Sequence, residues 1–238
     1  MGMHPVLAGR DRTLVGIPGR SGQLWVDSDG WCGVGMGPSV AVWFGNAHRG
    51  HTMGRLPGAT RTAADAVTQH RGADGISIES RCTREALTLT VRHWPIVLEG
   101  EVAWVVHATL ETTEDTEHEV RLGFAIRPAC VDGVAPIFEL NRNREGLWTA
   151  DGVPLLAMSQ NGTALLDGGH GRADPFHRFS GAVEPGPAVP AGECSVRCPA
   201  GLSSATEVFH GTLRRDQPMT HFAVFRPPPD TPATLVRT

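Results

Sequence analysis

The most constraining feature of this sequence is a strict alternation of side-chain character along residues 101–111. Val102, Trp104 and three further apolar residues alternate there with a second set that includes Val105 and His107. A period of two residues is typical of a β-strand, in which successive side chains point to opposite faces. Because both sets are mostly apolar, this strand is expected at the centre of a sheet whose two faces are covered.

The same alternation predicts further strands. Residues 120–126 repeat it after a polar bend at residues 112–118, and Arg127 and Pro128 close the segment. The two long segments are therefore expected to form a hairpin, from residue 101 to residue 128, in the middle of a sheet. Other strands are predicted at residues 75–81, 86–94, 137–140, 146–149, 155–158, 163–166, 194–197, 207–213 and 219–226.

Glycine and proline separate these strands. The chain contains 29 Gly and 18 Pro, which helices tolerate poorly and turns require. Asp151-Gly152 is one of several turn dipeptides between the predicted strands. Residues 55–72 carry no clear strand period, and a short helix is predicted at residues 63–70. The expected fold class is all-β, a large antiparallel β-sandwich with at most one or two short helices.

A single domain is expected, because neither a fixed repeat nor a break in composition divides residues 1–238. Residues 227–238 begin with prolines and are interpreted as a Pro-rich exit from the sandwich. The sequence shows no secretory signal and no apolar run of membrane-spanning length. The cysteine count of 5 is odd and the spacing irregular, which favours reduced thiols and predicts a cytoplasmic protein.

Charge and composition exclude several classes of function. A net charge of −4 gives no reason to expect a nucleic-acid partner. All 21 basic residues are arginine and tyrosine is absent, a bias that a GC-rich bacterial genome would produce. Lysine and tyrosine are thereby excluded as catalytic groups. No nucleotide-binding or nucleophile-elbow motif is present, so no cofactor is expected.

His48 and His51 form an H-x-x-H pair within a glycine-rich stretch. A metal site would need a third ligand and supporting hydrogen bonds, and the sequence assigns neither. Gly45, Gly50 and Gly54 favour a loop over a helix here. A loop with polar histidines is therefore favoured, and no metal is expected.

The cysteines are interpreted mainly as packing residues. Cys194 and Cys198 share one face of a predicted strand but are too far apart along it for a direct bridge. A zinc ribbon would need a closer spacing and a second pair. Cys130 follows Arg127 by three residues, and a nearby cation lowers a thiol pKa, but no base is recognisable beside it.

Five ionisable residues lie in or beside predicted strands: Glu99, Glu101, His107, Glu139 and His221. General acid–base catalysis needs two such groups held across a cleft, and neighbouring strands of a sandwich can supply them. Polar residues on a solvated sheet face would give the same pattern, and that interpretation is favoured.

Tryptophan carries most of the large aromatic surface, with 6 residues in a chain without tyrosine. Sugar rings stack on exposed aromatic side chains, so tryptophan near amide or charged groups indicates glycan contact. Trp104 lies within an apolar strand and is expected in the core, whereas Trp43 and Trp94 adjoin turn residues and are expected to be exposed. The candidate ligand-binding residues are Trp43, Asn46, His48, Trp94 and Arg127.

Three segments carry a resemblance to a known family: residues 122–128, 132–137 and 147–152. Over residues 99–177 the chain resembles the N-terminal, supersandwich-like β-sandwich domain of bacterial glycogen-debranching, glucoamylase-like glycoside hydrolases. In that family a strand ends in Ile-Arg-Pro, an Asn-Pro-Glu-Gly-like turn follows, and a hairpin comes later. Here the turn reads Cys-Val-Asp-Gly at residues 130–133, so the glycine is kept and the Asn and Pro are replaced.

The resemblance implies a non-catalytic role. In such enzymes the sandwich precedes a helical barrel that contributes the paired catalytic carboxylates. This chain stops where that barrel would begin, so the resemblance implies a carbohydrate-associated domain or accessory subunit of a glycoside-hydrolase-like system. Its expected partners are a glycan or another small molecule, and a helical-barrel catalytic domain or a second copy of the chain.

The alternative is a stand-alone, cofactor-free enzyme, such as a cyclase or isomerase of bacterial specialised metabolism. His107, Glu139 or Asp132 would then move a proton in a pocket of the sandwich. A shallow groove lined by Trp, Asn and Arg would favour a sugar ligand, and an enclosed apolar cavity with buried ionisable groups would favour the enzyme. A large, flat apolar surface would instead indicate a partner domain.

Overall fold

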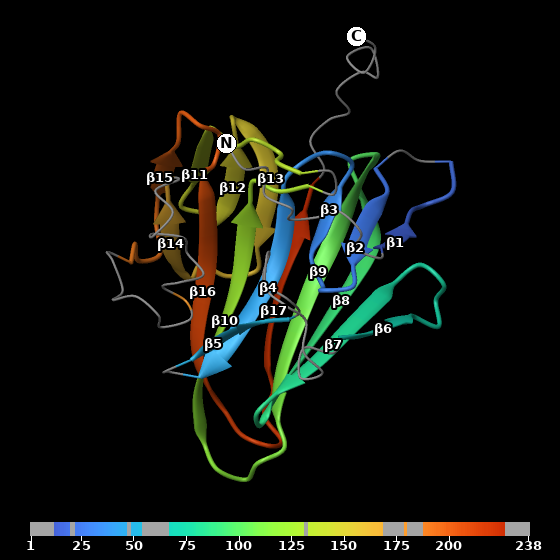
Figure 1. Ribbon diagram of the computed structural model, residues 1–238, viewed down its shortest axis with the longest axis vertical. Helices are drawn as coiled ribbons and strands as arrows, with labels where there is room; N and C mark the ends of the chain where they lie inside the picture. The colour runs from blue at the N-terminus through green and yellow to red at the C-terminus, as the bar shows by residue number, and fades with distance from the viewer. Residues whose placement is uncertain are drawn as a thin grey trace.

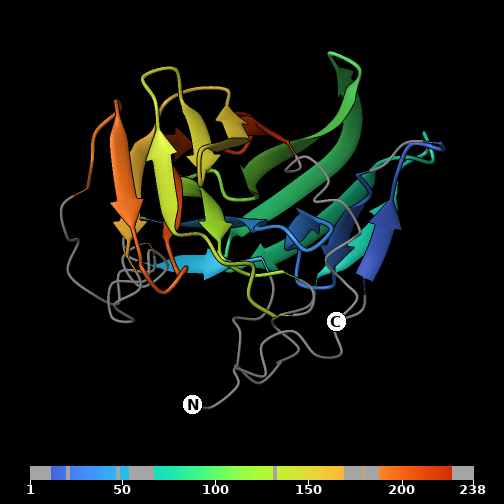
Figure 2. The same cartoon turned by 90° about the horizontal axis from the view of Figure 1, so that it is seen from above.

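The computed structural model describes residues 12–19, 22–46, 49–53, 67–130, 133–168, 179 and 188–226. These residues form two antiparallel sheets that pack face to face, and they contain no helix, so the predicted β-sandwich is confirmed (Figure 1). Seen from above, the two layers enclose one common core (Figure 2). No helix in this part of the chain is long and apolar enough to cross a membrane.

The first sheet has 8 strands and contains most of the N-terminal ones. In spatial order they are β1 (Arg12–Val15), β2 (Leu24–Asp27), β3 (Cys32–Val34), β4 (Ser39–Asn46), β10 (His118–Arg127), β16 (Ser204–Leu213) and β14 (Thr163–Asp167), with β5 (Gly50–Thr52) paired to β4.

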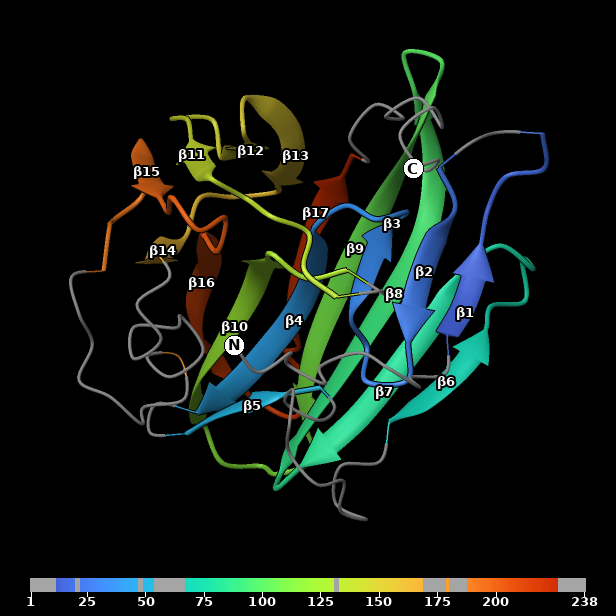
Figure 3. The ribbon, with the colours of Figure 1, turned by 45° about the horizontal axis from the view of Figure 1, so that its top comes forward.

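The second sheet has 9 strands, with β15, β11 and β12 at one flank and β8, β7 and β6 at the other (Figure 3). In spatial order they are β15 (Cys194–Arg197), β11 (Glu139–Arg142), β12 (Leu147–Ala150), β13 (Val153–Met158), β17 (Met219–Phe225), β9 (Glu101–Thr112), β8 (Leu87–Leu98), β7 (Ile78–Arg84) and β6 (Thr68–Arg71).

The predicted hairpin between the two longest segments is wrong. β9 pairs with β8 and β17 in one sheet, whereas β10 pairs with β4 and β16 in the other. The bend at residues 113–117 therefore carries the chain across the sandwich. Both strands present an apolar face to the common core, including Trp104 and Phe124, and each face buries the other. Alternation predicts which face is buried, but it does not distinguish a neighbour in the sheet from a partner across the core.

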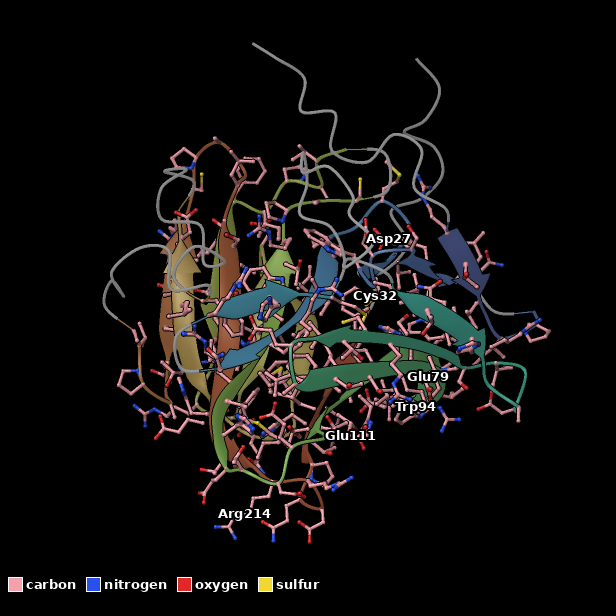
Figure 4. All side chains as sticks on the ribbon, turned by 60° about the horizontal axis from the view of Figure 1, so that its bottom comes forward. Asp27, Cys32, Glu79, Trp94, Glu111 and Arg214 are labelled. Atoms are coloured by element: carbon pink, nitrogen blue, oxygen red, sulfur yellow. The ribbon has the colours of Figure 1, made fainter. Side chains whose placement is uncertain are left out.

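The loop between β16 and β17 crosses the sandwich in the same way. Arg214 in this loop forms a 2.8 Å ion pair with Glu117, and Arg215 forms a 3.1 Å ion pair with Asp115. Arg214 therefore marks the end of the molecule at which both crossings occur (Figure 4). All four side chains are exposed, so these pairs contribute little to stability.

The predicted helix at residues 63–70 is also wrong where the structure describes it. Thr68–Arg71 forms the edge strand β6, paired with β7, and residues 63–66 lie outside the described residues. The Gln69 amide fixes this strand by donating to the Asp27 carbonyl at 2.6 Å and to the Ser80 hydroxyl at 3.2 Å. Pairing with a neighbour thus determines the conformation of a segment whose own pattern is weak.

A second apolar cluster covers the outer face of the first sheet. It consists of Trp25, Trp31, Ala41, Trp43, Ala125, Leu165, Phe179 and Val208. Strand β4 is consequently buried on both faces and shows no alternation, which explains why the sequence pattern did not predict it. His51 lies in strand β5 rather than in the expected loop, and His48 lies outside the described residues.

Candidate functional site

The outer face of the nine-stranded sheet carries a continuous row of apolar side chains. Cross-strand pairing connects five residues from β12 to β8: Leu147, Ala157, Val224, Val105 and Trp94. Val105 is buried and the other four are half-buried. Because neighbouring strands lie about 4.8 Å apart, this apolar row is about 19 Å long. It offers an extended surface to a ligand.

A second, mostly polar row runs beside the apolar row, displaced from it by two residues on β17, β9 and β8, the strands that both rows share. Its members are paired across β17, β9, β8, β7 and β6: Phe222, His107, Arg92, Glu79 and His70. Phe222, at the end of this row, is 44% exposed. In Figure 4, Glu79 and Trp94 lie on the side of the sheet that faces away from the core residue Cys32.

Trp94 is held between charged and polar neighbours. Its ring centroid lies 5.8 Å from that of His107 and 5.7 Å from the Arg92 guanidinium carbon. Arg92 is itself fixed by a 2.8 Å ion pair with Asp74, whose pKa is lowered to about 2, mainly by the hydroxyl hydrogen bond from Ser77. Partial burial, and then the Arg92 charge, lower the pKa of His107. The imidazole is therefore neutral at pH 7 and can both donate and accept hydrogen bonds.

An open depression of about 440 Å³ adjoins the other end of the apolar row. We call it the polar corner, and its lining residues are Asn141, Arg142, Asn143, Leu147, Thr149, Glu193, Cys194 and Ser195. Asn141 lies between its cross-strand partners Thr149 and Ser195. Leu147 belongs both to this corner and to the apolar row. The corner thus places amide and hydroxyl groups next to an apolar strip, an arrangement suited to a polyhydroxylated ligand.

Glu139 lies on β11, two residues before Asn141. Its carboxylate forms a 2.9 Å ion pair with Arg197, its cross-strand partner. The Arg197 hydrogen bond is the largest cause of a lowered Glu139 pKa, and the Asn141 side chain adds to it. Glu139 is therefore ionised at neutral pH and acts as an acceptor.

A fully buried ion pair lies beneath the polar corner, on the core side of its sheet. Arg142 contacts Glu207 at 2.7 Å, and the second Glu207 oxygen accepts a 2.9 Å hydrogen bond from the Trp148 indole. Arg142 also donates to the carbonyls of Gly192 and Pro190. Sequence reasoning missed this pair, although a charge at an inward position of each of two strands, β11 and β16, was the available indication. The pair ties the two sheets together.

The predicted ligand-binding residues do not form one cluster. Trp43 is only 1% exposed, so the expectation that it is exposed is wrong; the apolar cluster on the outer face of the first sheet covers it. Arg127 lies over the Trp43 ring at 5.7 Å, and the Asn46 side chain accepts a 2.7 Å hydrogen bond from the Arg49 amide. Trp94 belongs to the other sheet.

The structure does not bring the predicted acid–base residues together. His107 on β9 and Glu139 on β11 share the outer face, but three strands separate them. At about 4.8 Å per strand, the separation across the sheet alone is about 19 Å. Asp132 lies outside the described residues. Among the other candidates, Cys130 is buried, and His221 stacks on Phe209 with ring centroids 4.0 Å apart.

We expect Arg127 to be a structural residue, because its guanidinium lies over the buried Trp43 ring, and its replacement tests that role. Arg127→Ala removes the cation–π contact with the buried Trp43 and should lower the free energy of unfolding by about 1–2 kcal/mol. Urea denaturation followed by circular dichroism measures the change. Unchanged stability together with lost ligand binding would contradict the structural role.

Comparison with protein-family models finds no match, and comparison with curated proteins finds no similar sequence. In the part of the chain that the structure describes, no three His, Cys, Asp or Glu side chains are grouped as metal ligands would be.

Proposed function

We propose that this chain is a non-catalytic, carbohydrate-binding β-sandwich, and that the glycan lies along the apolar row and the polar corner. The observation that carries the proposal is the junction at Leu147, where a strip of about 19 Å ending in Trp94 meets amide and hydroxyl groups. Sugar rings need both kinds of surface, because their C–H faces pack on apolar groups while their hydroxyls hydrogen-bond.

The shape of the site supports binding rather than catalysis. The polar corner is open and most of its lining residues are of polar type, unlike the enclosed apolar cavity that a stand-alone enzyme of this kind would use. The resemblance to the sandwich domain of glycogen-debranching enzymes makes α-linked glucans the first ligands to test. In the same proposal, a helical-barrel catalytic domain supplies the paired carboxylates that glycoside hydrolysis requires.

Replacement of Trp94 tests the proposal directly. Wild-type protein should migrate more slowly in a native gel that contains a soluble α-linked glucan to which it binds. Binding of the corresponding oligosaccharides should be measurable by calorimetric titration. Trp94→Ala removes the aromatic end of the apolar row and should weaken binding about tenfold, or about 1.4 kcal/mol. Asn141→Ala should weaken the same interaction by removing an amide from the polar corner.

The control is Met36→Ala, which alters a side chain that is 59% exposed and follows β3 in the other sheet. It should leave glucan affinity unchanged. Equal retardation of wild type, Trp94→Ala and Asn141→Ala would exclude this face as the binding site. If no glycan in a broad panel binds to the wild-type protein, carbohydrate binding itself is excluded as the function.

A second candidate function is a cofactor-free enzyme, and His107 is the observation that favours it. The ring is half-buried against Trp94, and its lowered pKa keeps it neutral and able to accept a proton. Turnover of a small molecule by the wild type, abolished in His107→Gln at unchanged stability, would favour this function over glycan binding.

A further inference from the structure

A second depression, of about 530 Å³, lies on the first sheet, away from the proposed glycan site. It lies over β10 and β16, and its lining residues are Glu119, Val120, Arg121, His210, Gly211 and Thr212. Arg121 is the direct cross-strand partner of His210, and Glu119 is the partner of Thr212. Paired residues of two neighbouring strands therefore form the floor of the depression.

Arg121 is held in an unusual environment. Its guanidinium carbon lies 5.0 Å from the Phe179 ring centroid, and Gly123 provides the space for that ring, since a Cβ there would lie 3.0 Å from it. Among the residues that the structure describes, the Nε and Nη2 atoms of Arg121 are buried and find no hydrogen-bond partner. Leaving buried donors unsatisfied is costly, and a charged group increases the cost.

The two unsatisfied atoms have a specific geometry. Nε and Nη2 form one edge of the guanidinium, and their N–H groups point in parallel, matching two oxygens of a carboxylate or phosphate. His210 and Thr212 add donor groups on the same surface. Glu119 opposes an anion, but it is exposed, so water screens its charge.

We propose that this depression binds an oxyanion, the phosphate or carboxylate group of a ligand, through the Nε–Nη2 edge of Arg121 with His210 beside it. This edge is shielded from water, so an anion can reach it only when the guanidinium rotates away from Phe179 into the depression. The site is independent of the proposed glycan-binding face, because it belongs to the other sheet.

Titration with inorganic phosphate and with citrate, at constant ionic strength, tests the proposal. Calorimetry should show saturable binding of at least one anion, and the melting temperature should rise with its concentration. Binding of phosphate alone, citrate alone or both identifies the group that is recognised. Arg121→Met should bind at least about tenfold more weakly. Without added anion its melting temperature should equal or exceed that of the wild type, because an unsatisfied buried cation is removed.

The matched control is Arg81→Met, which removes an exposed arginine from the other sheet. It should keep the wild-type response and thereby separate binding from the general stabilising effect of such salts. His210→Gln provides a second variant if Arg121→Met does not fold, and it should also weaken binding. No saturable binding of either anion, or equal responses in the wild type and the Arg121 and His210 variants, would overturn the proposal.

Discussion

Replacing Glu207 with alanine should lower the free energy of unfolding by about 3–5 kcal/mol, because it leaves a buried arginine without its partner. Arg142 and Glu207 are both fully buried, and their contact of 2.7 Å joins β11 of one sheet to β16 of the other. Glu207 also accepts hydrogen bonds from the Trp148 indole and the Gly162 amide. Its loss therefore leaves several donors unsatisfied at once.

Urea denaturation of Glu207→Ala, followed by circular dichroism and by fluorescence, measures this change. Glu117→Ala is the matched control, because it breaks an arginine–glutamate pair that is exposed, and it should have little effect. The double variant Arg142→Met, Glu207→Leu should lose less than the sum of the two single losses, since neither charge then remains unpaired. A Glu207→Ala loss no larger than that of Glu117→Ala would contradict the account.

His93 should make the protein lose stability as the pH falls. Its side chain points into the core and is 1% exposed. Burial lowers its pKa from 6.5 to about 4, against a smaller opposing effect of the Ile78 backbone. Between these two pH values the unfolded chain binds a proton that the folded chain does not. Stability contributed by neutral His93 is therefore complete above the higher value and is lost toward the lower one, by about 3 kcal/mol.

Unfolding free energies at pH 7 and at pH 4.5 measure this dependence. His93→Leu keeps the site apolar and removes the titration, so its stability should fall less between the two pH values than that of the wild type. The control His70→Leu changes an exposed histidine on the edge strand β6 and should keep the wild-type pH dependence. A wild-type slope that persists in His93→Leu would show that other histidines cause it.

The elements of the fold were more predictable than their arrangement. Both faces of β9 were expected to be covered, but its outer face includes half-buried and exposed residues. Alternation predicted the positions of β9 and β10 and the buried face of β10, because period two follows directly from strand geometry. It could not show that these strands lie in different sheets, since their buried faces look the same in either arrangement. Strand β4 was missed for the opposite reason, because burial on both faces removes the alternation.

The candidate site was predictable only residue by residue. Trp94, His107 and Glu139 were identified from their chemistry, and all three lie on the outer face of the nine-stranded sheet. The apolar row could not be predicted, because it depends on the order β12, β13, β17, β9 and β8, which brings distant segments together. Trp43 has the same side chain as Trp94, but the cluster over its sheet buries it.

A crystal structure of the protein soaked with the glucan oligosaccharide of highest affinity tests the central claim most directly. We expect sugar density over the outer face of the nine-stranded sheet, with one ring against Trp94 or Leu147 and hydroxyls within hydrogen-bonding distance of Asn141 or Thr149. Density confined to another surface, or none at saturating sugar, would contradict it.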